Sequence, residues 1–340
     1  MENLNQTSGN RFILLGLANN PYMKALSVLI FLIMYIITLS VNSLLIIVVR
    51  INSQLQIPMY FFLSNLSIID ISFSSNIVPK LLVITLSQDR SVSFIDCALQ
   101  MFIHSSLGAT ECIILAVMAY DRYAAICKPL HYNTIINKRF CRYIPTGCWA
   151  VGFINSSIHV TSTFQLPFCR SHHVNHFFCE VPPFFQLSCQ DTWFNEVSIY
   201  MSACTIGLCS FFLTLISYVY IIPTILKIDS TQGRQKAFST CASHLTVVSL
   251  YYGTTMFMYL RPHSSYSPET DKTVSIIYTV VIPMLNPIIY SLRNRDVKVT
   301  IKKIRRQRWL EAHAAGVPAA SVYETPSYLN GREVDYKTLY

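Results

Sequence analysis

Seven long apolar segments divide most of this chain and constrain its fold more than any other feature of the sequence. Each is close to or above the roughly 20 residues that a helix needs to cross a lipid bilayer. They cover residues 25–49, 58–86, 97–120, 143–165, 197–226, 237–260 and 273–292. Only 13% of the 340 residues are charged, about half the share that is usual in soluble proteins. We therefore predict an all-α fold, a seven-transmembrane helix bundle over residues 25–292.

The charges between these segments indicate how the chain lies in the membrane. Lys and Arg gather in the connections 121–142 and 227–236 and after Leu292, whereas the connections on the opposite side carry Asp and Glu with few bases. Basic residues favour the cytoplasmic side, so we expect an extracellular N-terminus, residues 1–24, and a cytoplasmic C-terminus. The net charge of +9 then follows from topology rather than from nucleic-acid binding. No nucleotide, zinc or hydrolase motif is found.

The two ends of the chain carry signals of their own. Asn5 opens an Asn-Gln-Thr acceptor for N-glycosylation. Residues 293–308 are strongly basic with interspersed Val and Ile, which favours a short amphipathic helix held on the inner leaflet by anionic lipid. A solvated charged stretch is the alternative. Residues 309–340 show no sustained periodicity, so we expect a disordered cytoplasmic tail.

Four of the eleven cysteines fall in segments that we expect outside the cell: Cys97, Cys169, Cys179 and Cys189. An even number in an oxidising compartment favours disulfides, but three pairings are compatible with the sequence. The alternative is a metal site that uses nearby histidines, and we favour the disulfides. Those histidines are His172, His173 and His176.

Polar groups interrupt the apolar segments at a few positions. Asp70 and Glu111 are carboxyl groups within predicted spans, where an unpaired charge costs at least ~2.5 kcal/mol. Such groups either hold a cation or a proton, or only join helices to one another, and the sequence leaves both open. Asn286-Pro287 interrupts the seventh span, so we expect a kink there.

The third span ends in Asp121-Arg122-Tyr123, and a basic, proline-broken segment follows at once. Seven spans with this ending resemble the rhodopsin-like G-protein-coupled receptors. Four strings narrow the resemblance to the vertebrate odorant (olfactory) receptors: PMYFFLSNLSIID (58–70), MAYDRYAAICKPLHY (118–132), KAFSTCASHLTVV (236–248) and PMLNPIIYSLRN (283–294). Their order and their places on the spans make the match specific. It covers roughly residues 1–304 and leaves the tail without a counterpart.

The resemblance implies which cysteines pair and where an ion would bind. Cys97 would bond to Cys179, and Cys169 to Cys189. No catalytic cofactor is implied, and sodium would act as an allosteric modulator. Its ligands would be Asp70, Glu111 and Asn286.

The resemblance also implies how a signal would reach the cytoplasmic end. The inner end of the sixth span would move outward on activation, and Arg122 would then contact a G protein. The residues expected to rearrange or couple there are Asp121, Arg122, Tyr123, Tyr218 and Tyr290.

A ligand pocket is implied between the outer halves of the spans. His104, Gly108 and Cys112 recur at four-residue spacing and share one face of the third span. Stripes of this kind are more often core packing, and the resemblance is what favours a ligand site. The predicted pocket suits a small, mostly apolar molecule better than a charged amine. The predicted lining is His104, Ser105, Gly108, Cys112, Ser202, Ile206, Tyr252, Thr255, Met256 and Tyr259.

These features predict a multi-pass odorant receptor of the plasma membrane, not an enzyme, that activates a stimulatory (olfactory) G protein and raises cAMP. Its expected partners are a small-molecule odorant, that G protein and membrane lipid, with no nucleic acid. The alternative is a membrane ion or solute transporter that uses Asp70 and Glu111. The absence of inverted repeats in the sequence argues against a transporter.

Overall fold

The computed structural model describes residues 11–17, 21–52, 57–87, 89–169, 171–259 and 267–293, together with Leu55 and Val299. The chain divides into two units, Met1–Val297 and Lys298–Tyr340, and everything that follows concerns the first. Three predictions fall outside the described residues: glycosylation of Asn5, the basic segment after residue 293 apart from Val299, and the tail 309–340.

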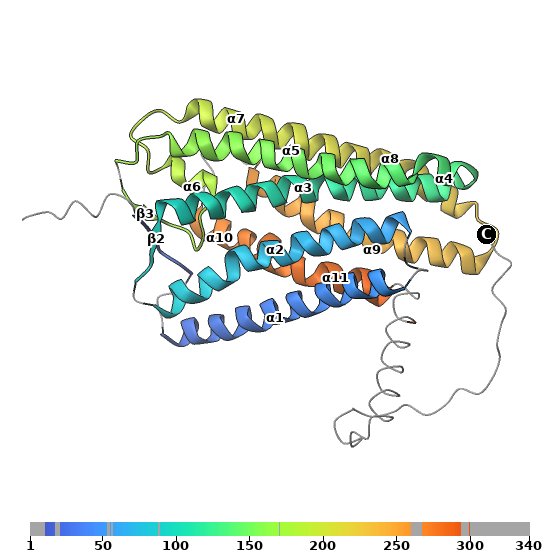
Figure 1. Cartoon of the computed structure of the whole chain (residues 1–340), viewed down its shortest axis with the longest axis horizontal. Helices are drawn as coiled ribbons and strands as arrows, with labels where there is room; N and C mark the ends of the chain where they lie inside the picture. Colours follow the sequence, from blue (N-terminus) through green and yellow to red (C-terminus); the bar gives the residue numbers. More distant parts are fainter. Residues whose placement is uncertain are drawn as a thin grey trace, which may run out of the picture. The chain divides into compact units, whose positions relative to one another are not determined.

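Long helices lie side by side and make up most of the structure (Figure 1). Several are continuous, among them α1 (Pro21–Ile51), α2 (Pro58–Leu86), α3 (Phe94–Cys127) and α9 (Thr231–Tyr259). Helix α5 (Lys138–Phe164) is also unbroken, and α3 packs against it and against α2 and α8. Short helices occupy the connections: η3 (Pro129–His131), α4 (Tyr132–Ile135) and α6 (Val181–Phe185).

Two of the long helices contain a π-helical turn. One runs from α7 (Trp193–Ala203) through η4 (Cys204–Leu208) into α8 (Cys209–Leu226). The other runs from α10 (Pro268–Ile276) through η6 (Ile277–Val281) into α11 (Ile282–Arg293), which contains Pro287. Single π turns inside α-helices often mark functional sites.

In the described part of the chain, five helical stretches are long and apolar enough to cross a membrane: Tyr22–Ile51, Pro58–Leu86, Phe94–Cys127, Trp193–Leu226 and Pro268–Tyr290. Helices α5 and α9 reach the same length with more polar residues, and α9 begins in the polar stretch before Ala237. Exposed apolar side chains such as Leu29, Ile33 and Ile36 form a stripe on α1. Such a stripe is stable facing lipid. The predicted helical membrane bundle is confirmed.

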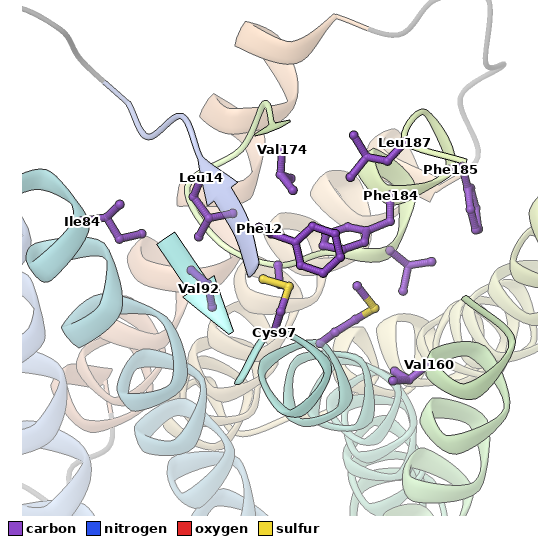
Figure 2. Close-up of a cluster of buried hydrophobic side chains, with 13 residues drawn as sticks. Phe12, Leu14, Ile84, Val92, Cys97, Val160, Val174, Phe184, Phe185 and Leu187 are labelled. Atoms are coloured by element: carbon purple, nitrogen blue, oxygen red, sulfur yellow. A yellow bond between two sulfur atoms is a disulfide. The ribbon is translucent and has the colours of Figure 1, made fainter. Parts of the chain in front are cut away.

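A small sheet at one end of the bundle was not predicted from the sequence. Strand β1 (Arg11–Leu14) lies between β2 (Ser91–Ser93), which is antiparallel to it, and β3 (His173–Val174), which is parallel. Phe12 and Leu14 alternate with more exposed residues and are buried (Figure 2). Two to four residues per strand carry too weak an alternation to be read from sequence. We call this the sheet end of the bundle, and the end with η3 and α4 the opposite end.

Candidate functional site

A cavity lies among the helices, with a volume of ≈ 140 Å³. Both π-helical turns contribute to its wall, through Ile206 of η4 and Tyr278 of η6. Cavities of about 150 Å³ with apolar walls bind molecules of the size of benzene. The lining residues are Phe73, His104, Ser105, Gly108, Ala109, Cys112, Asn155, His159, Val181, Ile199, Ser202, Ala203, Ile206, Gly207, Leu208, Tyr251, Thr255, Met256 and Tyr278.

Eight of the ten predicted lining residues are brought together around this cavity: His104, Ser105, Gly108, Cys112, Ser202, Ile206, Thr255 and Met256. The side chain of Tyr259 lies outside the described residues. Tyr252 is not part of the lining, and its neighbour Tyr251 takes that place. The helical turn decides this, because consecutive residues on a helix point about 100° apart.

Both tyrosines join α9 to the backbone of α3. The hydroxyl of Tyr251 donates to the carbonyl oxygen of Gly108 over 2.6 Å, beside the cavity. The hydroxyl of Tyr252 donates to the carbonyl oxygen of Cys112 over 2.9 Å, one helical turn further along α3. A ligand that displaces α9 must therefore act against two hydrogen bonds, one buried and one partly buried.

The predicted lining lacks residues of α5 and of the connection between α5 and α7, which the structure places in the wall. Asn155 and His159 reach the cavity from α5 at a spacing of four residues, and Val181 reaches it from α6. The four-residue spacing is a helical signal of the kind used for α3. It could have been noticed, whereas nothing in the sequence around Val181 indicates its position.

Aromatic rings fix the position of His104 in the wall. Its ring centroid lies 5.5 Å from that of Phe73, 4.9 Å from that of Phe178 and 5.8 Å from that of Tyr278. Both ring nitrogens are buried and have no hydrogen-bond partner among the described residues. Buried polar atoms usually have one, so His104 has hydrogen-bonding capacity that the protein itself does not use.

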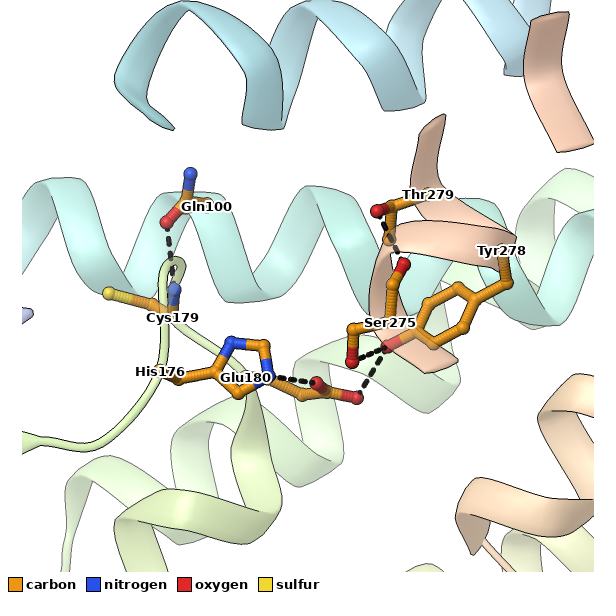
Figure 3. A network of polar contacts seen from close by, with 7 residues as sticks. All are labelled: Gln100, His176, Cys179, Glu180, Ser275, Tyr278 and Thr279. Atoms are coloured by element: carbon orange, nitrogen blue, oxygen red, sulfur yellow. Dashed lines mark hydrogen bonds and ion pairs between the residues drawn. The ribbon is translucent and has the colours of Figure 1, made fainter. Parts of the chain in front are cut away.

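A polar network that includes the lining residue Tyr278 lies at the sheet end (Figure 3). The hydroxyl of Tyr278 donates to Oε1 of Glu180 over 2.8 Å, and Nε2 of His176 lies 3.9 Å from Oε2 of the same carboxyl group. Burial, with smaller contributions from the charge of Lys272 and from His104, lowers the pKa of His176 to about 3. The ring is therefore neutral at physiological pH, and the contact with Glu180 is not an ion pair there.

Disulfides hold in place the connection between α5 and α7, residues 165–192. Cys97 at the start of α3 is bonded to Cys179, and Cys169 to Cys189. The backbone N–H of Cys179 also donates to Oε1 of Gln100 on α3 over 2.9 Å. The pairing that the resemblance implies is confirmed. The metal alternative is wrong, since the four cysteines are bonded and the described residues hold no group of three His, Cys, Asp or Glu side chains that could bind a metal ion.

Asp70 and Asn286 meet in the core of the bundle. Nδ2 of Asn286 donates to Oδ1 of Asp70 over 3.0 Å, and Glu111 is close enough for the two carboxyl groups to interact electrostatically. Oδ2 of Asp70 and both carboxyl oxygens of Glu111 are buried without a hydrogen-bond partner in the described part of the chain. Carboxyl and amide oxygens are the donors that hard cations prefer. These residues therefore fit a sodium ion.

At the opposite end, Asp121 and Arg122 are buried within α3, which continues to Cys127. The described residues contain no ion pair between Asp121 and Arg122, although the two charges attract each other. Asp121 instead accepts a hydrogen bond from the hydroxyl of Tyr132, over 2.8 Å. Consecutive helix residues do not face each other, so the carboxyl group reaches the next connection instead.

Arg122 lies among residues of three other helices. Its charge interacts with Tyr218 of α8, His244 of α9 and Tyr290 of α11. Nε and Nη2 of its guanidinium have no hydrogen-bond partner among the described residues. The ring of Tyr123 packs against that of Tyr220 on α8, at 5.9 Å between centroids. The structure thus gathers the residues predicted for coupling at this end.

His244 is a further residue of this group, to which the sequence analysis assigned no role although it lies in one of the four strings. Its Nε2 lies 3.1 Å from the carbonyl oxygen of Leu115 on α3, and its Nδ1 lies 2.9 Å from the hydroxyl of Tyr218 on α8. One imidazole therefore joins α3, α8 and α9. A histidine within an apolar segment was the signal available in the sequence.

Comparisons with known proteins agree with this arrangement. A family model described as Olfactory receptor matches residues 31–308. The chain is 49% identical over 304 residues to olfactory receptor 5AP2 of Mus musculus, which covers 89% of this chain and 96% of that protein. It is 47% identical over 300 residues to olfactory receptor 5B21 of Homo sapiens, with 88% and 97% covered. For olfactory receptor 5A2 of Homo sapiens the identity is 48% over 299 residues, with 88% and 92% covered.

Proposed function

Because the chain belongs to the olfactory receptor family, whose members are odorant-sensing G-protein-coupled receptors of the plasma membrane and not enzymes, we propose that an odorant binds in the cavity and activates a stimulatory G protein. The resulting rise in cAMP is the output. The observation that carries this proposal is the cavity itself, whose wall includes residues of α9 and also Tyr278, which donates to Glu180.

The size and chemistry of the cavity support a small neutral ligand. A volume of ≈ 140 Å³ accommodates a molecule of about ten heavy atoms or fewer. At about −0.6 kcal/mol per heavy atom, such a ligand binds with roughly −6 kcal/mol, or tens of micromolar. Its lining residues are mainly apolar, and none of those described carries a permanent charge.

The orientation of the chain follows from chemistry at the two ends of the bundle. Both disulfides lie at the sheet end, and disulfides persist in an oxidising environment. The basic connections after α3 and α8 lie toward the other end. We therefore place the N-terminus outside the cell and the C-terminus in the cytoplasm. A mobility shift on glycosidase treatment, lost in Asn5→Gln, tests this orientation.

Helix α9 is the element that would carry the signal. A ligand that touches Thr255 and Met256 acts on α9 directly, beside the bond from Tyr251 to Gly108. About three turns further along the same helix, His244 contacts α3 and α8 near Arg122. The ligand shifts the population toward a state with α9 displaced, by no more than its difference in affinity for the two states.

A sodium ion at Asp70, Glu111 and Asn286 is part of the proposal. When bound, it supplies positive charge that offsets two buried carboxyl groups. Asn286 orients Asp70 through their hydrogen bond, and its place on α11 links the site to the helix that carries Tyr290.

The decisive test is Arg122→Ala in cells that report cAMP. Its guanidinium has unused donors at the opposite end of the bundle, so it is available to a partner there. The variant should reach the surface and yet give no cAMP response to odorants that activate the unaltered receptor. A normal response at equal surface expression would contradict the mechanism. Ion flux into receptor-loaded vesicles would support the transporter alternative, which the two carboxyl groups still motivate.

A further inference from the structure

The hydrogen-bonding groups around the cavity differ in what they offer to a ligand, and this difference selects a ligand class. Several of the lining hydroxyl groups use their hydrogens within the protein. Oγ1 of Thr255 donates to the carbonyl oxygen of Tyr251 over 2.8 Å, and the Tyr251 hydroxyl itself donates to Gly108. Ser202 donates to Oδ1 of Asn155, and Tyr278 donates to Glu180. The hydroxyl oxygens of Thr255 and Ser202 keep lone pairs that accept a hydrogen bond.

His104 can both donate and accept a hydrogen bond. A neutral imidazole has one N–H donor and one acceptor nitrogen, and neither nitrogen of His104 has a partner in the described part of the chain. The packing of three aromatic rings around His104 fixes its position. The wall therefore offers acceptors at Thr255 and Ser202 and, at His104, a ring that both accepts and donates.

Charge restricts the ligand further. No described lining residue is a Lys, Arg, Asp or Glu. A charged ligand would lose its hydration in this cavity without gaining a counter-charge. Aliphatic amines and carboxylic acids are charged at neutral pH. The ligands that remain are neutral molecules with a hydrogen-bond donor.

We propose, on the premise that the cavity is the odorant site, that this receptor selects small neutral alcohols and phenols over the corresponding ethers, ketones and hydrocarbons. A hydroxyl group both donates and accepts, so it satisfies the lone pairs of the wall and either tautomer of His104. An ether or ketone oxygen only accepts, and a hydrocarbon does neither. The apolar remainder of the ligand lies against residues such as Ile206 and Met256.

The experiment compares matched probes at the unaltered receptor. Benzyl alcohol, benzyl methyl ether, benzaldehyde, ethylbenzene, benzylamine and benzoate form one set. Cyclohexanol, methoxycyclohexane, cyclohexanone and methylcyclohexane form a second. Both cAMP in cells and the thermal unfolding temperature of the purified full-length receptor are measured against probe concentration. In at least one set the alcohol should act at about tenfold lower concentration than its ether and hydrocarbon, which is the effect expected of one additional hydrogen bond.

A pair of neighbouring substitutions tests whether the cavity wall causes the preference. Thr255→Val removes a lining oxygen at nearly constant shape and should reduce the alcohol-to-ether ratio several-fold. Thr254→Val is the matched control, because Thr254 bonds the carbonyl oxygen of Leu250 and is not among the lining residues. His104→Phe should reduce the ratio as well. Because each ratio is taken within one variant, differences in surface expression cancel.

The outcomes separate this inference from the proposed function. Ethers, ketones, hydrocarbons or charged probes that act at concentrations equal to or below those of the matched alcohols would overturn the inference and leave the receptor function standing. A ratio that Thr254→Val changes as much as Thr255→Val would also overturn it. Alcohols that raise the unfolding temperature without raising cAMP would support the ligand class and contradict the coupling. No effect of any alcohol on either measurement would overturn the inference.

Discussion

Nε2 of His244 on α9 lies 3.1 Å from the backbone carbonyl oxygen of Leu115 on α3. A carbonyl oxygen only accepts, so Nε2 carries the hydrogen, and Nδ1 of the neutral ring then accepts from the hydroxyl of Tyr218. The histidine therefore holds α9 against both α3 and α8. An outward movement of α9 at this end must lengthen these contacts.

The first prediction follows from this contact. His244→Phe keeps a ring of similar size but removes both hydrogen bonds, each worth about 1 kcal/mol. The arrangement with α9 held against α3 loses stability, so ligand-free cAMP should rise about fivefold or more. Tyr143→Phe, at an exposed position on α5, serves as a control for loss of one hydroxyl. Unchanged or lower basal cAMP at equal surface expression would show that the contact does not oppose activation.

A second prediction concerns the bond between Asp121 and Tyr132. Asp121→Asn and Tyr132→Phe affect the same hydrogen bond, which fixes the connection after α3. We expect each change to lower the maximal cAMP response, and the double variant to be no worse than the more severe single one. Such non-additivity is typical of residues in contact. Additive losses would mean that the two residues act separately.

The third prediction concerns the outer disulfides. The Cys97–Cys179 bond spans 82 residues and ties the connection between α5 and α7 to α3. Removing a native disulfide typically costs about 2–5 kcal/mol, so Cys97→Ser or Cys179→Ser should abolish surface delivery. Cys204→Ser removes an unpaired thiol in η4 and should have little effect. Surface labelling in intact cells measures all three, and equal losses would contradict the assignment.

The fourth prediction is a pH dependence of stability. The pKa of His176 is lowered to about 3 in the folded protein, from about 6.5 in an unfolded chain. Between these values the unfolded state binds one more proton, so His176 makes stability fall as pH decreases below 6.5, by up to about 1.4 kcal/mol per unit. His176→Phe should reduce the drop in unfolding temperature between pH 7 and pH 5. His173→Phe, at an exposed position in β3, should leave that drop unchanged.

The sequence predicted the helix bundle and eight of the nineteen residues that line the cavity, because apolar length and four-residue spacing are properties of one chain segment at a time. What it missed depends on contacts between segments. Tyr251 and Tyr252 are adjacent and chemically identical, and only the rotation of α9 against α3 decides which one faces the cavity. The partner of Asp121 likewise depends on where the connection with Tyr132 folds back.

The last prediction uses two glycines of α5 that the sequence does not distinguish. A Cβ at Gly152 would lie 2.6 Å from the carbonyl oxygen of Ser106 and still closer to Oγ1 of Thr110, both on α3, whereas a Cβ at Gly147 would meet nothing within 4 Å. Ser106 and Thr110 cannot easily yield, since Thr110 donates to the Ser106 carbonyl over 2.7 Å and both are buried. Gly152→Ala must then separate α5 from α3, at a cost of about 1–3 kcal/mol.

Gly147→Ala should leave the folded protein as stable or slightly more stable, because Ala is a better helix former by about 1 kcal/mol and the new methyl group has free space. Thermal unfolding of the two purified variants measures the difference, with Gly152→Ala unfolding several degrees below the unaltered receptor and Gly147→Ala at or slightly above it. Asn155 and His159 line the cavity from the same helix, so separating α5 from α3 also displaces part of the wall. Gly152→Ala should therefore weaken odorant responses by more than its loss of surface protein explains. If the variant keeps both its stability and its response, α3 and α5 pack less closely than described.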